Sequence, residues 1–154
     1  MASNQVAGSG TTEIVRSRNV TPSSPPKKTR DGSVGQPSAG KKITLMVGVK
    51  GDPFYVSMQC GAQAEAKKLG NVTVNTQGPA KFDPTLQNPI IESVTASHPN
   101  AIMIAPDDVS ASQTPVDQAM AAGIKVVLVD TTLNDPSKAV SQISSNNLAG
   151  GADA

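Results

Sequence analysis

The sequence is poor in aromatic residues, cysteine and histidine. Its 154 residues include two Phe, one Tyr and no Trp, with a single Cys and a single His. One thiol excludes an internal disulfide framework and a multi-cysteine zinc site. Because aromatic residues are so scarce, we expect a hydrophobic core built from Val, Ile, Leu, Met and Ala.

Strong net charge and long apolar runs are missing as well. The 13 basic and 12 acidic residues give a formal net charge of +1, so no broad electrostatic field attracts nucleic acid or anionic lipid. No run approaches the roughly 20 apolar residues that a membrane-spanning helix needs. Residues 1–9 also lack the basic stretch and the apolar segment of a secretory signal. We therefore expect no nucleic-acid partner and no signal peptide in this sequence.

The common motifs of nucleotide binding and nucleophilic catalysis are absent too. Residues 48–51 lack the Gly-x-Gly-x-x-Gly spacing of a dinucleotide site, and no phosphate-loop Gly-Lys-Ser/Thr is present. His98 lies in an expected loop, and Cys60 lies within an expected helix with no histidine near it in sequence. Asp107 and Asp108 resemble a metal-binding pair, but turn and capping roles explain them better. We therefore expect a protein that is not an enzyme and that holds no cofactor or metal.

The composition divides the chain near residue 40. Roughly half of residues 1–40 are Ser, Thr, Gly or Pro, and the apolar residues among them are isolated. Such a segment buries too little apolar surface to offset its chain entropy, so we expect a disordered tail or linker there. Residues 41–154 have the composition of one folded domain, which is also what the chain length accommodates.

Strand and helix patterns alternate from residue 41 onward. Apolar, β-branched runs predict buried strands, and Asp-Pro, Thr-Pro and Gly signals mark the helices between them. Alternation of this kind predicts a doubly wound α/β fold with a parallel sheet. The expected strands are 43–49, 72–76, 101–105, 126–129 and 139–143, and the expected helix starts are Asp52-Pro53, either Asp83-Pro84 or Asn88-Pro89, Thr114-Pro115, and a turn after Ser144.

Polar and aromatic side chains follow the carboxyl ends of these strands, where ligands of open α/β sheets bind. Phe54 and Tyr55 are two of only three aromatic residues and directly follow the first expected strand. An aromatic ring covers the apolar C–H face of a sugar, and carboxylates and amides bind its hydroxyl groups. Asp52, Asp130 and Asn147 supply such groups. The residues alone leave two interpretations open: a ligand site, or ordinary core packing at the start of the first helix.

Several segments, in this order and spacing, resemble the sugar-binding periplasmic binding proteins of the ribose-binding type, which are the solute receptors of ABC importers. The resemblance runs from about residue 41 to the end and covers one N-terminal lobe. The segments are VGV at 47–49, DPFY at 52–55, GA at 61–62, AEA at 64–66, LG at 69–70, AIMIAP at 101–106, AAGIKVV at 121–127, VD at 129–130 and SNNLAGG at 145–151.

The resemblance implies strand order 2-1-3-4-5 and a role for each of the residues after the strands. Asp52 takes the position of a polar residue that bonds the sugar, and Phe54 and Tyr55 take the positions of the aromatic rings that flank it. Asp130 matches the family's ligand aspartate after the fourth strand. Asn147 falls in the asparagine motif after the fifth.

Two further positions qualify the expected ligand. Asp107 is a weaker member of the same implied site. Thr131 stands where the family often has an arginine that bonds the sugar oxygens, which disfavours ribose itself. The resemblance therefore implies a monosaccharide or polyol as ligand, the membrane permease of an ABC importer as partner, and a periplasmic or other extracytoplasmic location.

Length and the segment before residue 41 bear on how the domain would be used. Family members have a second, similar lobe and close on the ligand between the two, so we expect a truncated lobe, a fragment that binds weakly alone. The alternative is the effector-binding domain of a sugar-responsive transcriptional repressor. That alternative needs DNA-binding helices ahead of residue 41, where no amphipathic helical pattern is found.

Overall fold

The computed structural model describes residues 40–152. The tail or linker expected at 1–40 therefore lies outside the described residues except for Gly40. Residues 40–152 contain five strands and four helices, which alternate as the sequence pattern predicts except that no helix separates the fourth and fifth strands. In chain order they are β1 (Lys41–Met46), α1 (Pro53–Leu69), β2 (Val72–Gln77), α2 (Pro84–Ala96), β3 (Ala101–Ile104), α3 (Gln113–Ala121), β4 (Lys125–Val129), β5 (Ser141–Ile143) and α4 (Asn147–Ala152).

The strands form one sheet in the order β2-β1-β3-β4-β5. Each neighbouring pair is parallel, and Ile43 of the interior strand β1 pairs with Val74 on one side and Ala101 on the other. The predicted doubly wound α/β fold and the predicted strand order are thus confirmed. Since all strands run the same way, their carboxyl ends meet along one side of the sheet, which we call the strand-end edge. It comprises residues 47–55, 78–83, 105–108, 130–132 and 144–145.

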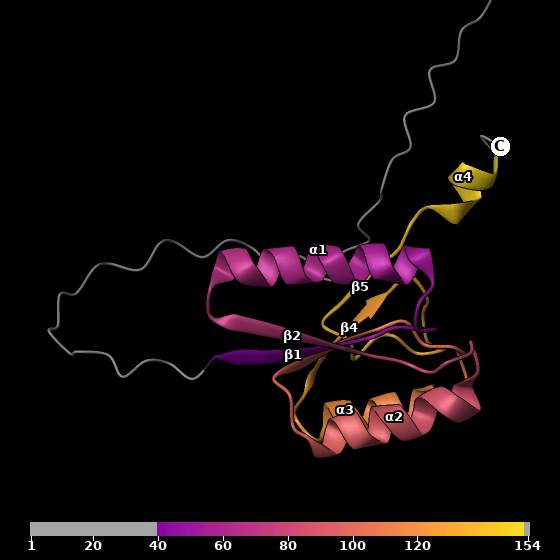
Figure 1. Cartoon of the computed structure of the whole chain (residues 1–154). Helices are drawn as coiled ribbons and strands as arrows, with labels where there is room; N and C mark the ends of the chain where they lie inside the picture. Colours follow the sequence, from indigo (N-terminus) through magenta and orange to yellow (C-terminus); the bar gives the residue numbers. More distant parts are fainter. Residues whose placement is uncertain (1–39, 153–154) are drawn as a thin grey trace, which may run out of the picture.

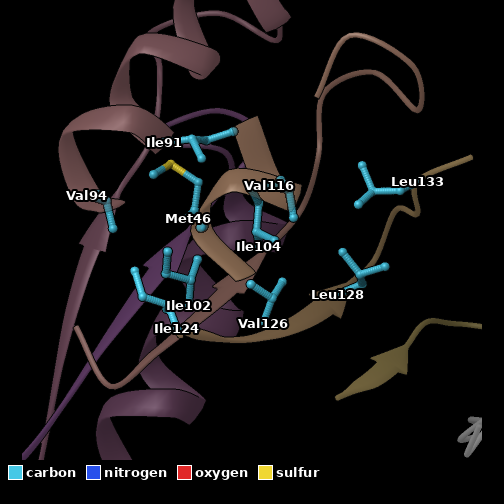
Figure 2. Close-up of a cluster of buried hydrophobic side chains, with 11 residues drawn as sticks. Met46, Ile91, Val94, Ile102, Ile104, Val116, Ile124, Val126, Leu128 and Leu133 are labelled. Carbon is cyan, nitrogen blue, oxygen red and sulfur yellow. The ribbon is translucent and has the colours of Figure 1, made fainter. Parts of the chain in front are cut away.

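Helices cover both faces of the sheet. Figure 1 shows α1 on one face and α2 and α3 on the other. Successive residues of β1 serve opposite faces, as side chains of a strand do: Leu45 and Val47 pack with Tyr55 of α1, whereas Met46 packs on the other side. Figure 2 shows this second cluster, where Met46 lies beside Ile91 of α2. The sheet therefore lies between two separate hydrophobic cores, one on each face.

Asp-Pro pairs start two of the helices. The Asp52 carboxylate accepts a hydrogen bond from the backbone N–H of Phe54, and Asp83 accepts one from that of Thr85, both at 2.8 Å. Both aspartates are thus N-caps, and the proline that follows each of them occupies the first helical position. α2 consequently begins at the earlier of its two predicted starts, with Pro89 inside the helix.

Some boundaries differ from the sequence prediction. β1 ends at Met46 rather than at residue 49; the apolar pattern continues because Val47 is still buried after the last paired residue. α3 begins at Gln113, so Thr114 is not its N-cap. Pro115 instead lies within the first turn, where N–H groups have no helical partner and a proline removes no hydrogen bond. β5 is also shorter than predicted.

Candidate ligand-binding site

The centre of the strand-end edge is a hydrogen bond between Tyr55 and Asp130. The Tyr55 hydroxyl donates to Asp130 Oδ2 at 2.9 Å, and the tyrosine ring is buried in the core beneath α1. Burial of the ring, together with the bond to Asp130 and its charge, raises the pKa of the Tyr55 hydroxyl. The tyrosine therefore remains a donor and fixes one oxygen of the Asp130 carboxylate.

The backbone of Asp130 is unusual. Its φ is 66°, in the left-handed region that non-glycine residues seldom adopt and that aspartate tolerates better than most. Its N–H donates to the carbonyl of Ile143 at 2.9 Å, so the residue is tied to the end of β5 as well as to Tyr55. Backbone of this kind, over-determined by its surroundings, is typical of functional positions. The carboxylate is thus held in one place before any ligand arrives.

Phe54 and Asp52 lie beside this pair at the start of α1. The Phe54 ring is 50% exposed and meets the Tyr55 ring edge-on, with centroids 5.3 Å apart and planes at 74°. Asp52 caps α1 with one carboxylate oxygen, as described above. The structure therefore separates the two adjacent aromatic residues. Phe54 offers its ring to solvent, whereas Tyr55 reaches the edge with its hydroxyl.

Asp107 is held by hydrogen bonds within the protein. Its Oδ2 accepts from the backbone N–H of Asp83 at 2.9 Å and its Oδ1 from the side-chain amide of Gln87 at 3.0 Å. Burial raises the pKa of the Asp107 carboxyl to about 6. The residue thus lies at the edge as predicted, and both of its oxygens already have partners.

The raised pKa predicts a pH dependence of stability. The unfolded chain ionises Asp107 near 3.8 and the folded chain near 6, so the contribution of this group to the free energy of unfolding falls as pH rises through that window. In thermal melts between about pH 4 and about pH 7, we expect the Tm of Asp107→Asn minus that of the wild type to rise with pH.

A neighbouring aspartate provides the control. Hydrogen bonds from the N–H groups of Ala111 and Ser110 lower the pKa of Asp108, so its stabilising contribution is lost only below the ordinary range. Asp108→Asn should therefore show a Tm difference that is nearly constant above about pH 5 and that does not rise with pH below it. A constant difference for Asp107→Asn as well would show that Asp107 does not titrate there.

Gln87 is a residue that the sequence analysis missed. It is fully buried, and its amide nitrogen donates to the carbonyls of Val47 at 3.3 Å and Ala105 at 2.8 Å as well as to Asp107. Its amide oxygen accepts from the backbone N–H of Asp107 at 3.0 Å. One side chain of α2 thus joins the ends of β1 and β3. Gln87 lies four residues before Ile91 and therefore on the apolar face of α2, and this spacing could have identified it from the sequence.

Thr131 and Asn147 complete the predicted set. The Thr131 hydroxyl donates to the carbonyl of Pro106 at 2.7 Å and so bridges the loops after β3 and β4. Asn147 begins α4, which Figure 1 shows set apart from the sheet and from α1, and its side chain is exposed. The structure therefore brings together Asp52, Phe54, Tyr55, Asp107, Asp130 and Thr131 at the strand-end edge, and it leaves Asn147 outside this group.

Within residues 40–152, no helix has both the length and the apolar character needed to cross a bilayer. The same residues contain no group of three or more His, Cys, Asp or Glu side chains placed to hold a metal ion. Cys60 is exposed, and His98 follows α2 at the opposite edge of the sheet.

Comparisons with known proteins all identify the same family. A periplasmic binding protein domain matches residues 43–154. The ribose import binding protein RbsB of Bacillus subtilis is 33% identical over 109 residues, covering 71% of this chain and 35% of that protein. The D-apiose import binding protein of Paraburkholderia graminis is 31% identical over 118 residues, covering 77% and 37%. The chain therefore spans little more than a third of the length of these relatives.

Solved structures agree. A solute binding protein of an ABC transporter from Agrobacterium vitis, bound with α-D-tagatopyranose, superposes with a TM-score of 0.68 at 34% identity, covering 72% of this chain and 40% of that one. The family domain matches well over half of the present chain, and the segments quoted from the sequence lie within the matched residues. The sheet order is the one that the resemblance implies. The chain thus belongs to the periplasmic binding protein family.

Proposed function

We propose that this chain is a sugar-receptor lobe of an ABC importer, which binds a monosaccharide or polyol at the strand-end edge. The observation that carries the proposal is the pre-positioned Asp130 carboxylate, bonded to the buried Tyr55 hydroxyl, next to the exposed ring of Phe54. A fixed acceptor for hydroxyl groups beside an apolar ring matches the two surfaces that a sugar presents. The similar proteins that bind or import ribose, apiose and tagatose support the same class of ligand.

We assign the remaining residues smaller roles in this proposal. Asp52 and Thr131 each face the edge with a side-chain oxygen that already serves the protein, so we assign them to the rim of the site. Asp107 acts mainly by fixing the loop after β2 through Asp83. Asn147 would join the site only if α4 moved toward the sheet. The permease of an importer and an extracytoplasmic location follow from the same family membership and belong to this proposal.

Titration of the full chain with sugars, followed by ¹H–¹⁵N correlation spectra, tests the proposal. We expect arabinose and tagatose to shift the amide signals of residues at the strand-end edge, with dissociation constants in the millimolar range, because one lobe supplies only part of the contacts that a closed receptor makes. Phe54→Ala should weaken binding about tenfold through the loss of one aromatic contact.

Two outcomes would contradict this proposal. A folded chain whose spectrum is unchanged by any of these sugars would exclude sugar binding by the lobe itself. Shifts confined to the opposite edge of the sheet would place the ligand elsewhere. Val140→Ala serves as the control for the loss of an exposed apolar side chain, since Val140 is 56% exposed and precedes β5.

A further inference from the structure

The third aromatic residue, Phe82, also lies at the strand-end edge. It follows β2 and precedes α2 by two positions, and 52% of it is exposed to solvent. All three aromatic residues of the chain, two Phe and one Tyr, thus lie at the same edge, although two come from the first turn of α1 and one from the loop after β2. Phe82 thus adds a second half-exposed aromatic ring to an edge that already carries the exposed ring of Phe54.

The Phe82 ring reaches the centre of the edge because Gly48 has no side chain. A Cβ atom on Gly48 would lie 2.5 Å from Phe82 Cε2 and 2.7 Å from the Tyr55 hydroxyl oxygen. Phe82 Cε2 and the Tyr55 hydroxyl oxygen therefore both lie close to the position that a Cβ atom on Gly48 would occupy, just after the end of β1. Any side chain on Gly48 would displace the ring from this position. The ring edge of Phe82 consequently neighbours the hydroxyl that donates to Asp130.

Hydrogen bonds of the next residue, Asp83, fix the backbone beside Phe82. The N–H of Asp83 donates to Asp107, as described above, and the Asp83 carboxylate accepts from both the N–H and the hydroxyl of Thr85, at 2.8 and 2.7 Å. The backbone beside Phe82 is therefore anchored at two points. An anchored backbone at this point lowers the entropy that is lost when a ligand packs on the ring, which favours binding.

We propose that Phe82 is a further sugar-contacting residue that favours cyclic sugars over small acyclic polyols. The inference rests on the proposed function. Phe54 packs against the ring of Tyr55, whereas Phe82 approaches its hydroxyl. A sugar whose hydroxyl group reaches the Asp130 carboxylate therefore meets the ring of Phe54 from α1 and the ring of Phe82 from the loop after β2. A pyranose or furanose presents a C–H face for this second ring to cover, and glycerol presents almost none.

Sugar titrations of full-length Phe82→Ala and Phe82→Trp test the assignment. We expect Phe82→Ala to raise the dissociation constants of arabinose and tagatose about fivefold to tenfold and to leave any weak binding of glycerol within about twofold. The chain has no tryptophan, so the emission of Phe82→Trp comes from a single indole. That emission should change on addition of arabinose and stay constant with glycerol.

A matched control separates binding from folding. Leu69→Ala also truncates an exposed apolar side chain, since Leu69 is 62% exposed, but at the far end of α1. It should bind sugar as the wild type does, and both alanine variants should keep the wild-type Tm within the small range typical of surface substitutions.

The possible failures are distinguishable. A wild-type chain that binds no sugar overturns the proposed function, and this inference with it. Sugar binding by the wild type that is matched by Phe82→Ala overturns the role of Phe82 alone, as does indole emission that is unchanged at saturating arabinose.

Discussion

Replacement of Gln87 by leucine is expected to lower the free energy of unfolding by about 3–5 kcal/mol. Leucine keeps much of the volume of glutamine, but it leaves the carbonyls of Val47 and Ala105 and the N–H of Asp107 without the partner that each has in the wild type. Each buried, unpaired group costs about 1–3 kcal/mol. Equilibrium unfolding in urea measures the change.

The same substitution at an exposed glutamine is the matched control. Gln63 lies on the exposed face of α1, and Gln63→Leu should change the free energy of unfolding by less than about 0.5 kcal/mol. A loss of less than about 1 kcal/mol in Gln87→Leu would mean that water satisfies the three backbone groups. In that case Gln87 would not be the link that holds the strand-end edge together.

Asp130→Asn should produce the largest change in ligand affinity. Asparagine keeps the shape of the side chain, tolerates the left-handed backbone at φ 66°, and still accepts the hydrogen bond from Tyr55. Only the charge is lost, so that charge-assisted bonds to sugar hydroxyls become ordinary ones. Bonds to charged groups contribute about 1.5–3 kcal/mol against about 1 for neutral ones. We therefore expect the sugar dissociation constant to rise about tenfold or more.

Titration calorimetry or spectral titration of Asp130→Asn measures this loss, and Asp135→Asn is the control at an exposed aspartate. Asp130→Ala would be less informative, because alanine in the left-handed region adds backbone strain to the lost contacts. Unchanged affinity in Asp130→Asn, with the fold intact by circular dichroism, would remove Asp130 from the binding site.

The sequence predicts most of the fold because its signals are local. Asp-Pro pairs mark the starts of α1 and α2, and apolar runs mark the strands; the strand order came from the family resemblance. The start of α3 is missed because Thr114-Pro115 has the form of a cap, while the helix begins at Gln113 without a side-chain cap. The end of β1 is missed because Val47 continues the apolar run but packs against α1 beyond the last paired residue.

The site is harder to predict from the sequence because it depends on the direction in which each helical side chain points. Phe54 and Tyr55 are adjacent, yet successive helical residues point about 100° apart. Tyr55 shares its face with Met58 and Ala62, at helical spacing, and these pack in the same core. That spacing is a signal for a buried Tyr55, and the sequence analysis, which left both rings open between a ligand site and core packing, did not use it. No local pattern predicts the close approach of Phe82 to Gly48, because it joins two loops that only the folded sheet brings together.

The interior position of β1, between β2 and β3, has a consequence for synthesis. β1 comes first along the described chain, but one of its two neighbours is β3, whose Ala101 pairs with Ile43 from 58 positions later. At the ribosomal rate of about 5–20 residues per second, that partner emerges roughly 3–12 s after Ile43. During this interval the apolar residues Leu45 and Met46 lack one side of their sheet. One side of β1 therefore stays unpaired until more than half of the domain has been synthesised.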